Sequence, residues 1–119
     1  MALDTKKSTG NWGEDRAAQF LYDKGHRQIV RNWRRGYLEV DLFSVCEKRL
    51  HVTEVKTRLE GVLGNPSDWL SARQQQRLVE AAHFYIQYVQ WEGETQFDVL
   101  AITHKNPLVF NYIPNAFYP

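Results

Sequence analysis

Three acidic side chains and one lysine stand at a spacing that could bring them together in one reactive site. Glu39 and Asp41 lie in one apolar segment, and Glu54 and Lys56 lie in the next. Successive side chains of a strand point to opposite faces, so each of these pairs is expected to share a face. A turn near residues 46–49 would make the two segments neighbours. Carboxylates that close repel each other unless a cation lies between them, so the spacing predicts a metal site.

The donor types favour a hard divalent cation. Mg²⁺ prefers oxygen ligands and usually keeps several waters, so two carboxylates suffice where phosphate oxygens complete the coordination. Asp41 and Glu54 meet that requirement, and the backbone carbonyl of Val55 is a candidate third ligand. Lys56 would lie beside the scissile phosphate and orient the attacking water or offset charge in the transition state. The pattern predicts hydrolysis of a phosphodiester with Mg²⁺ or Mn²⁺.

A structural interpretation of the same residues stays open. Glu54 and Lys56 would then be an ion pair on an exposed strand, and Asp41 would cap a turn or pair with an arginine. The apolar neighbours, such as Val40 and Val52, favour the functional interpretation, because charges among them are costly to bury without a purpose.

A basic segment leads into the acidic one. Between Asp23 and Glu39 the chain has no acid, and its cations there are Lys24, Arg27, Arg31, Arg34 and Arg35. The net charge is only +1, so this local concentration is more informative than the sum. Such arginines could hold a phosphate backbone beside the carboxylates, and Trp33 among them could stack on an unpaired base. The alternative is a solvated loop whose arginines form surface ion pairs.

Composition limits the other classes of function. With 119 residues, 43% of them hydrophobic and 24% charged, the chain is expected to form one domain spanning 1–119. No apolar run approaches the length of a membrane span, and the first residues lack a signal-peptide stretch, which predicts a cytoplasmic protein with no membrane contact. A lone cysteine, Cys46, excludes an internal disulfide and a CxxC zinc site. His51 is expected on the strand face opposite Glu54, and His26, His83 and His104 are scattered, which argues against a histidine-based site.

Hydrophobic periodicity predicts the elements that position these residues. Helices are expected over 11–24 and 68–90, and strands over 29–30, 37–45, 50–57, 97–103 and 108–113. In the second strand Leu38, Val40 and Leu42 are expected on one face, with Phe43 on the other. Residues 58–67 carry glycines and a proline, which is typical of a ligand-contacting loop. The order predicts an α/β layered domain with a mixed five-stranded sheet and helices on both sides.

Glu14 lies in the first predicted helix, on the face that should turn inward. It precedes Ala18 by four residues and Leu21 by seven. One interpretation is that its negative charge caps the helix or interacts favourably with the helix dipole near the helix start. The other is that it reaches the metal.

Spaced matches to a known family extend along nearly the whole chain. They are Gly13-Glu14 with Ala17, Arg31-Asn32, Glu39-Val40-Asp41-Leu42, Glu54-Val55-Lys56-Thr57-Arg58, Gly64, Pro66, Arg77-Leu78 with Ala81, and Phe97-Asp98-Val99. With these residues the chain resembles the bacterial YraN-like endonuclease family, which is related to archaeal Holliday junction resolvases within the PD-(D/E)xK superfamily. Several matches in order are much more specific than an ExK motif alone.

The resemblance implies a restriction-endonuclease-like three-layer fold and assigns roles to the acids. It implies that Asp41 and Glu54 bind the metal, that Lys56 is the catalytic lysine, and that Glu14 is an additional catalytic acid on the helix. Glu39 would be a supporting or alternative metal ligand. It also implies an endonuclease acting on nucleic acid, with DNA favoured over RNA and branched DNA as the resolvase-like substrate. A homodimer is expected by the same analogy, because resolvases act on two strands symmetrically.

The chain departs from the family pattern at two positions. Leu38 stands where glycine is usual, and Gln74 stands near a usual lysine, flanked by two arginines. The expected nucleic-acid contacts are Arg31, Trp33, Arg34, Arg35, Arg58, Arg73 and Arg77. Two other functions stay open: a nucleic-acid-binding module with weak or no cleavage, and a scaffold that joins a partner in a DNA-processing complex.

Overall fold

The computed structural model describes residues 5–59 and 69–119. Its elements, in chain order, are α1 (Thr5–Asp23), β1 (Arg27–Arg35), β2 (Leu38–Cys46), β3 (Arg49–Leu59), α2 (Ala72–Val89), β4 (Glu94–His104) and β5 (Val109–Phe117). The strands form one sheet in the order β1-β2-β3-β4-β5, in which only β3 and β4 run parallel. A parallel pair needs a long crossover, and α2 lies in the connection that supplies it.

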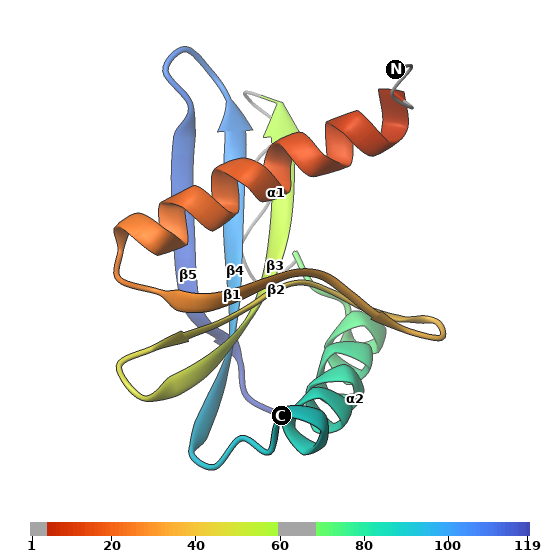
Figure 1. Ribbon diagram of the computed structural model, residues 1–119. Helices are drawn as coiled ribbons and strands as arrows, with labels where there is room; N and C mark the ends of the chain where they lie inside the picture. The colour runs from red at the N-terminus through yellow and green to blue at the C-terminus, as the bar shows by residue number, and fades with distance from the viewer. Residues whose placement is uncertain (1–4, 60–68) are drawn as a thin grey trace.

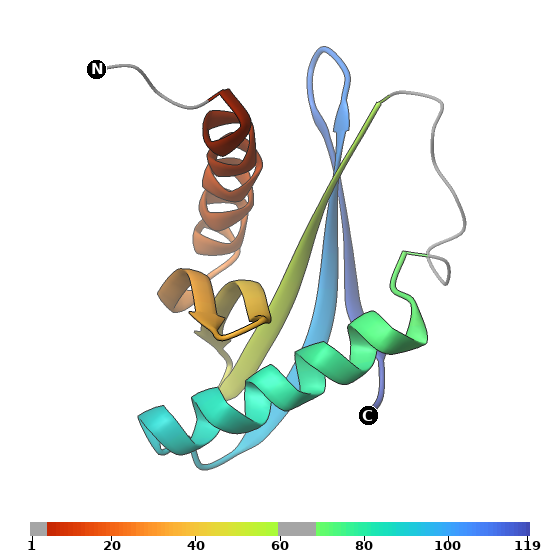
Figure 2. The same cartoon turned by 90° about the vertical axis from the view of Figure 1, so that its right-hand side faces the viewer.

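The two helices cover opposite faces of the sheet, so the fold has three layers (Figure 1). Figure 2 shows the twisted sheet between them, with α1 on one side and α2 on the other. Beneath α1, Ala17 and Leu21 pack against Leu42, Leu100 and Ile102. The predicted α/β, restriction-endonuclease-like fold class is therefore confirmed. Neither helix, over the residues that the structure describes, is long and apolar enough to cross a membrane.

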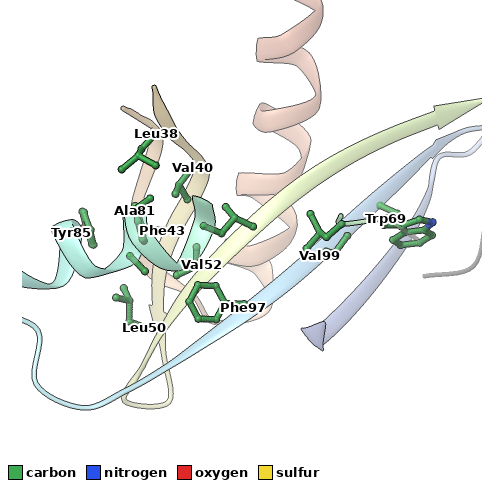
Figure 3. Packing of buried hydrophobic residues seen from close by; sticks show 14 residues of the cluster. Leu38, Val40, Phe43, Leu50, Val52, Trp69, Ala81, Tyr85, Phe97 and Val99 are labelled. Atoms are coloured by element: carbon green, nitrogen blue, oxygen red, sulfur yellow. The ribbon is translucent and has the colours of Figure 1, made fainter. Parts of the chain in front are cut away.

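The larger core lies between α2 and the sheet (Figure 3). The Phe43 ring on β2 stacks on Tyr85 of α2, with centroids 3.8 Å apart and planes within 8°. The Trp33 ring meets both of these rings edge-on. The helix is fixed at its start by a capping box, in which the Ser71 side chain accepts from the Gln74 N–H and the Gln74 side chain accepts from the Ser71 N–H. These contacts fix α2 across β2, beside the acids of that strand.

The predicted order of elements is confirmed, and their ends differ from the prediction. Helix α1 begins at Thr5 rather than near Asn11, and β1 extends over Arg27–Arg35 rather than two residues. The basic segment is therefore a strand and not a solvated loop. The predicted loop begins with two residues of β3, and its remainder lies outside the described residues, as does the predicted start of the second helix. Helix α2 is described from Ala72.

Strand β2 changes face at Asp41. Val40 and Phe43 both pack in the α2 core although they are three residues apart, while Leu42 packs beneath α1. The prediction that Leu42 shares a face with Leu38 and Val40 is therefore wrong, and Phe43 lies on their face instead. Strict alternation is interrupted between Val40 and Phe43, so Asp41 projects at a point where the strand rotates.

Strand β1 makes the same change directly opposite. Val30 and Trp33 both pack against the α2 core, and Asn32 between them has a φ of +53°. The pairs Arg31–Leu42 and Trp33–Val40 place Asn32 opposite Asp41. Strands β1 and β2 therefore rotate together at one level of the sheet, and the candidate site lies at this level.

Candidate functional site

Asp41 is held where β2 and β3 stop pairing through their backbones. The paired residues end at Leu42–Thr53, and this register places Asp41 next to Glu54. One residue further along β3, the Val55 N–H donates to Asp41 Oδ2 at 2.8 Å. A side-chain carboxylate thus satisfies this N–H. The bond fixes the Asp41 carboxylate beside the start of the Glu54-Val55-Lys56 motif.

Glu54 and Lys56 lie together on β3, as their spacing predicts. Lys56 Nζ is 3.6 Å from Glu54 Oε1, and their side chains are only 16% and 21% exposed respectively. Val52, two residues before Glu54, is buried in the α2 core. The pair therefore continues the α2-facing side of β3 beyond the apolar core, where the strand meets solvent.

Glu14 reaches this cluster from α1. The residue before it, Gly13, lies so close to β3 that a Cβ there would be 2.9 Å from the Thr57 methyl carbon. Glycine therefore lets the helix backbone approach the strand. Glu14 accepts a hydrogen bond from the Asn32 side chain, while its Oε2 atom is buried with no protein partner.

Burial and mutual repulsion make the carboxylates hard to ionise. The pKa of Asp41 is raised to about 7, chiefly by burial and then by the negative charge of Glu54; the bond from the Val55 N–H opposes this rise, and the charges of Glu14 and Glu39 add to it. Burial also raises the pKa of Glu54, against the opposing effect of Lys56. The pKa of Glu14 is raised by burial as well, despite its bond from Asn32. Acids with raised pKa values that face one another are typical of functional sites.

The donor set fits a hydrated divalent cation better than an enclosed one. Within residues 5–59 and 69–119, no three His, Cys, Asp or Glu side chains are grouped so that they could hold a metal ion. Asp41 and Glu54, with the Val55 carbonyl, offer the partial set of oxygens that Mg²⁺ accepts while it keeps its waters. The unpartnered Oε2 of Glu14 is a further acceptor for such a water. The residues therefore fit Mg²⁺ or Mn²⁺.

Glu39 occupies the outer edge of the cluster. It is exposed, and Arg34 Nη2 lies 3.2 Å from its Oε1. Its charge nevertheless raises the pKa values of Asp41, Glu54 and Glu14. Glu39 therefore acts on the other three acids electrostatically, with one of its oxygens engaged by an arginine.

The predicted cations of β1 do not form a single cluster. Arg31 forms an ion pair with Asp15 of α1. The Arg35 guanidinium lies over the Phe84 ring of α2, 4.2 Å from its centroid. Trp33 packs in the α2 core, so its prediction as a base-stacking residue does not agree with its position. Of the predicted β1 contacts, Arg34 and Arg35 are exposed; Arg34 pairs with Glu39, and Arg35 lies against α2.

A second set of predicted contacts lies near the start of α2. Arg77 lies over the ring of the exposed Tyr37, 5.7 Å from its centroid, and Arg73 is exposed one turn earlier. Arg58 follows Lys56 on β3 and donates to the carbonyl of Thr57. A cavity of about 190 Å³ joins this region to the acids; it is lined by Tyr37, Glu39, Glu54, Leu70, Gln74, Arg77 and Leu78. Gln74, where the family usually has lysine nearby, completes the α2 capping box.

Comparisons with known proteins identify the family of this chain. The family model described as "Uncharacterised protein family UPF0102" matches residues 13–102, which include Gly13, the four acids and Lys56. The chain belongs to the UPF0102 family. The resemblance to the YraN-like family is thereby confirmed.

Relatives named "UPF0102 protein" match over most of their length. That of Nitratidesulfovibrio vulgaris (strain DP4) is 35% identical over 117 residues, which are 97% of this chain and 87% of the relative. That of Marinobacter nauticus is 36% identical over 119 residues, covering 98% and 97%. That of Phocaeicola vulgatus is 33% identical over 111 residues, covering 92% of each chain.

The sequence analysis missed a buried polar cluster in this UPF0102 protein. His26 was predicted to be isolated, but its ring centroid is 4.5 Å from that of His51, and its Nδ1 is 2.7 Å from Ser44 Oγ. His51 Nδ1 is 2.8 Å from Asp98, which also accepts from Tyr112. The available signal was Asp98 itself, an acid within the apolar strand β4. The cluster links the connection between α1 and β1 to β2, β3, β4 and β5 on the α1 side of the sheet.

Proposed function

We propose that this protein is a metal-dependent endonuclease that hydrolyses nucleic-acid phosphodiesters. The observation that carries the proposal is the convergence of Asp41, Glu54 and Glu14 beside Lys56, with the pKa values of all three acids raised. A fold needs no such costly cluster of carboxylates for its stability. A bound cation removes that cost.

Each residue of the site has a distinct proposed role. Asp41 and Glu54, with the Val55 carbonyl, would hold Mg²⁺ or Mn²⁺, which when bound supplies Lewis-acid chemistry and a water of lowered pKa. Lys56, kept in place by Glu54, would donate to a phosphate oxygen as negative charge builds up in the transition state. Glu14, with one free oxygen, would accept a hydrogen bond from the attacking water and orient it. Its role is thus to position the water on the α1 side.

The substrate surface extends over β1 and the start of α2. Arg34 and Arg35 are exposed on β1, and Arg73 and Arg77 are exposed on α2. Contacts from both elements would hold a phosphate backbone across Glu54 and Lys56. The resolvase-like family resemblance supports branched DNA as the substrate and a homodimer as the acting form.

A second candidate function is a nucleic-acid-binding module without cleavage. Its support is the incomplete ligand set, since the described part of the chain holds no group of three side chains suited to a metal. In that case the acids would bind an ion weakly and serve only to orient the nucleic acid. A scaffold that holds a DNA-processing partner would need no ion at all.

A cleavage assay with Mn²⁺ tests the proposal. Wild type, Glu54→Gln and the exposed control Glu92→Gln are incubated with branched, duplex and single-stranded DNA and RNA. We expect cleavage by wild type and Glu92→Gln, at least 100-fold slower cleavage by Glu54→Gln, and a cooperatively folded protein in all three cases. If none of them cleaves while all bind nucleic acid, the binding module replaces the nuclease. If none of them binds, the scaffold does.

A further inference from the structure

Asn32 has a backbone conformation that an L-residue in a strand rarely adopts. Its φ is +53°, in the left-handed region, where asparagine is one of the tolerated side chains. It lies opposite Asp41, at the level where β1 and β2 both change face. The sequence thus places an unusual residue beside the candidate site, and the proposed chemistry assigns it no role.

The Asn32 side chain contacts one acid of the cluster. It hydrogen-bonds the Glu14 carboxylate, whose Oε2 stays buried without a protein partner. The preceding residue, Arg31, forms an ion pair with Asp15. Two consecutive residues of β1 therefore hold two consecutive residues of α1. This contact fixes the rotation of α1 about its axis as well as its distance from the sheet.

We infer that Asn32 is a positioning residue, whose left-handed backbone directs its amide to Glu14 and leaves the second Glu14 oxygen available to the metal-bound water. The inference rests on the proposed function. An amide suits this task because it donates a hydrogen bond without adding charge to a cluster that is already negative. Lysine would neutralise Glu14, and aspartate would repel it.

The variant Asn32→Gly separates the side chain from the backbone. Glycine adopts a positive φ readily, so the strand can keep its local geometry while the amide is lost. The matched control is Gln28→Gly, because Gln28 lies on the same strand with a φ of +52° and contacts none of the four acids. Glu14→Gln and the double variant Asn32→Gly with Glu14→Gln complete a cycle that measures the coupling between the two residues.

Two measurements on the full chain are made for wild type and the variants of this double-mutant cycle. Mn²⁺ affinity is measured by calorimetry, and the NMR signals of the Asn32 side-chain amide are recorded without metal. We expect Asn32→Gly to weaken Mn²⁺ binding about tenfold, as loss of a group that orients a ligand typically does. Gln28→Gly should leave the affinity unchanged. The double variant should bind no more weakly than Glu14→Gln, because Asn32 acts through Glu14, and Glu14→Gln should shift the Asn32 amide signals.

The outcomes separate this inference from the proposed function. Mn²⁺ binding by wild type, weakened by Glu14→Gln but not by Asn32→Gly, would overturn the inference and leave the metal site standing. Additive losses in the double variant would assign Asn32 a purely structural role and also overturn it. Absence of Mn²⁺ binding by wild type would overturn the proposed function and with it the positioning role, whatever the amide signals show.

Discussion

Replacing Asp41 by asparagine should stabilise the metal-free protein, and more so at higher pH. The folded-state pKa of Asp41 is raised from 3.8 to about 7, chiefly by burial and the charge of Glu54. A raised pKa means that folding favours the protonated form of Asp41. The protein therefore keeps its full stability with respect to this group below about pH 4, and loses part of it as the pH rises through 7 and Asp41 ionises. The full difference corresponds to about 4 kcal/mol, at about 1.4 kcal/mol per pKa unit. Asparagine has the same shape and carries no charge to bury.

The assay is urea unfolding followed by tryptophan fluorescence in EDTA, at pH 5 and pH 8. About 3 kcal/mol of the penalty arises between these values, so the stability gained by Asp41→Asn should grow by up to that amount from pH 5 to pH 8. The control Asp23→Asn changes an exposed acid at the end of α1 and should alter stability by less than about 0.5 kcal/mol at either pH. A gain that is equal at both pH values, or a loss at pH 8, would refute the electrostatic account of the site.

Three further predictions concern packing, the buried acid and the binding surface. Gly13→Ala should destabilise the protein by about 1–3 kcal/mol, because the new methyl overlaps the Thr57 methyl, and adding Thr57→Ser should restore the loss, both measured by urea unfolding. Hydrogen bonds hold the pKa of Asp98 below 3.8 despite its burial, so the stabilising effect of Asp98 is present above about pH 4 and is lost on acidification. Asp98→Asn should lower the free energy of unfolding by about 3 kcal/mol at pH 7. It should also make the stability of the protein less sensitive to pH at the acidic end of a pH titration. Arg34→Glu with Arg35→Glu should weaken nucleic-acid binding and reduce its dependence on salt in a fluorescence titration.

Each of these has an outcome that contradicts it. A Gly13→Ala protein as stable as wild type would mean that α1 and β3 can separate at no cost. If Asp98→Asn loses stability on acidification as steeply as wild type, groups other than Asp98 cause the loss of stability at low pH. An unchanged salt slope after both arginine substitutions would remove this end of β1 from the binding surface.

Local patterns in the sequence were sufficient to predict the element order and to place Asp41, Glu54 and Lys56 near one another. Glu54 and Lys56 share one face of their strand whatever the rest of the fold is, because this depends only on the alternation of side chains along a strand. The pairing of Asp41 with Glu54 needed only one turn to be placed correctly. Such short-range regularities are encoded within a few residues, and they were predicted well.

Features that depend on two distant segments were not predicted. The change of face at Asp41 requires a matching change at Asn32. The pattern of apolar residues in either strand alone does not predict this change. The contact between His26 and His51 joins the connection between α1 and β1 to β3, and periodicity carries no information about such a pairing. Trp33 was assigned to the surface because of its arginine neighbours, yet its bulk completes the core under Tyr85.

The position of β1 gives its arginines another effect. Among the residues that the structure describes, it is the first strand of the sheet and pairs only with β2, so its other side carries backbone groups that could pair with a strand of another molecule. Charged side chains along such an edge oppose that pairing, and Arg27, Arg31, Arg34 and Arg35 all lie on β1. Replacing these arginines by apolar residues would therefore lower solubility and could be mistaken for a loss of binding. Reversing their charge keeps the edge protected while abolishing its attraction for phosphate.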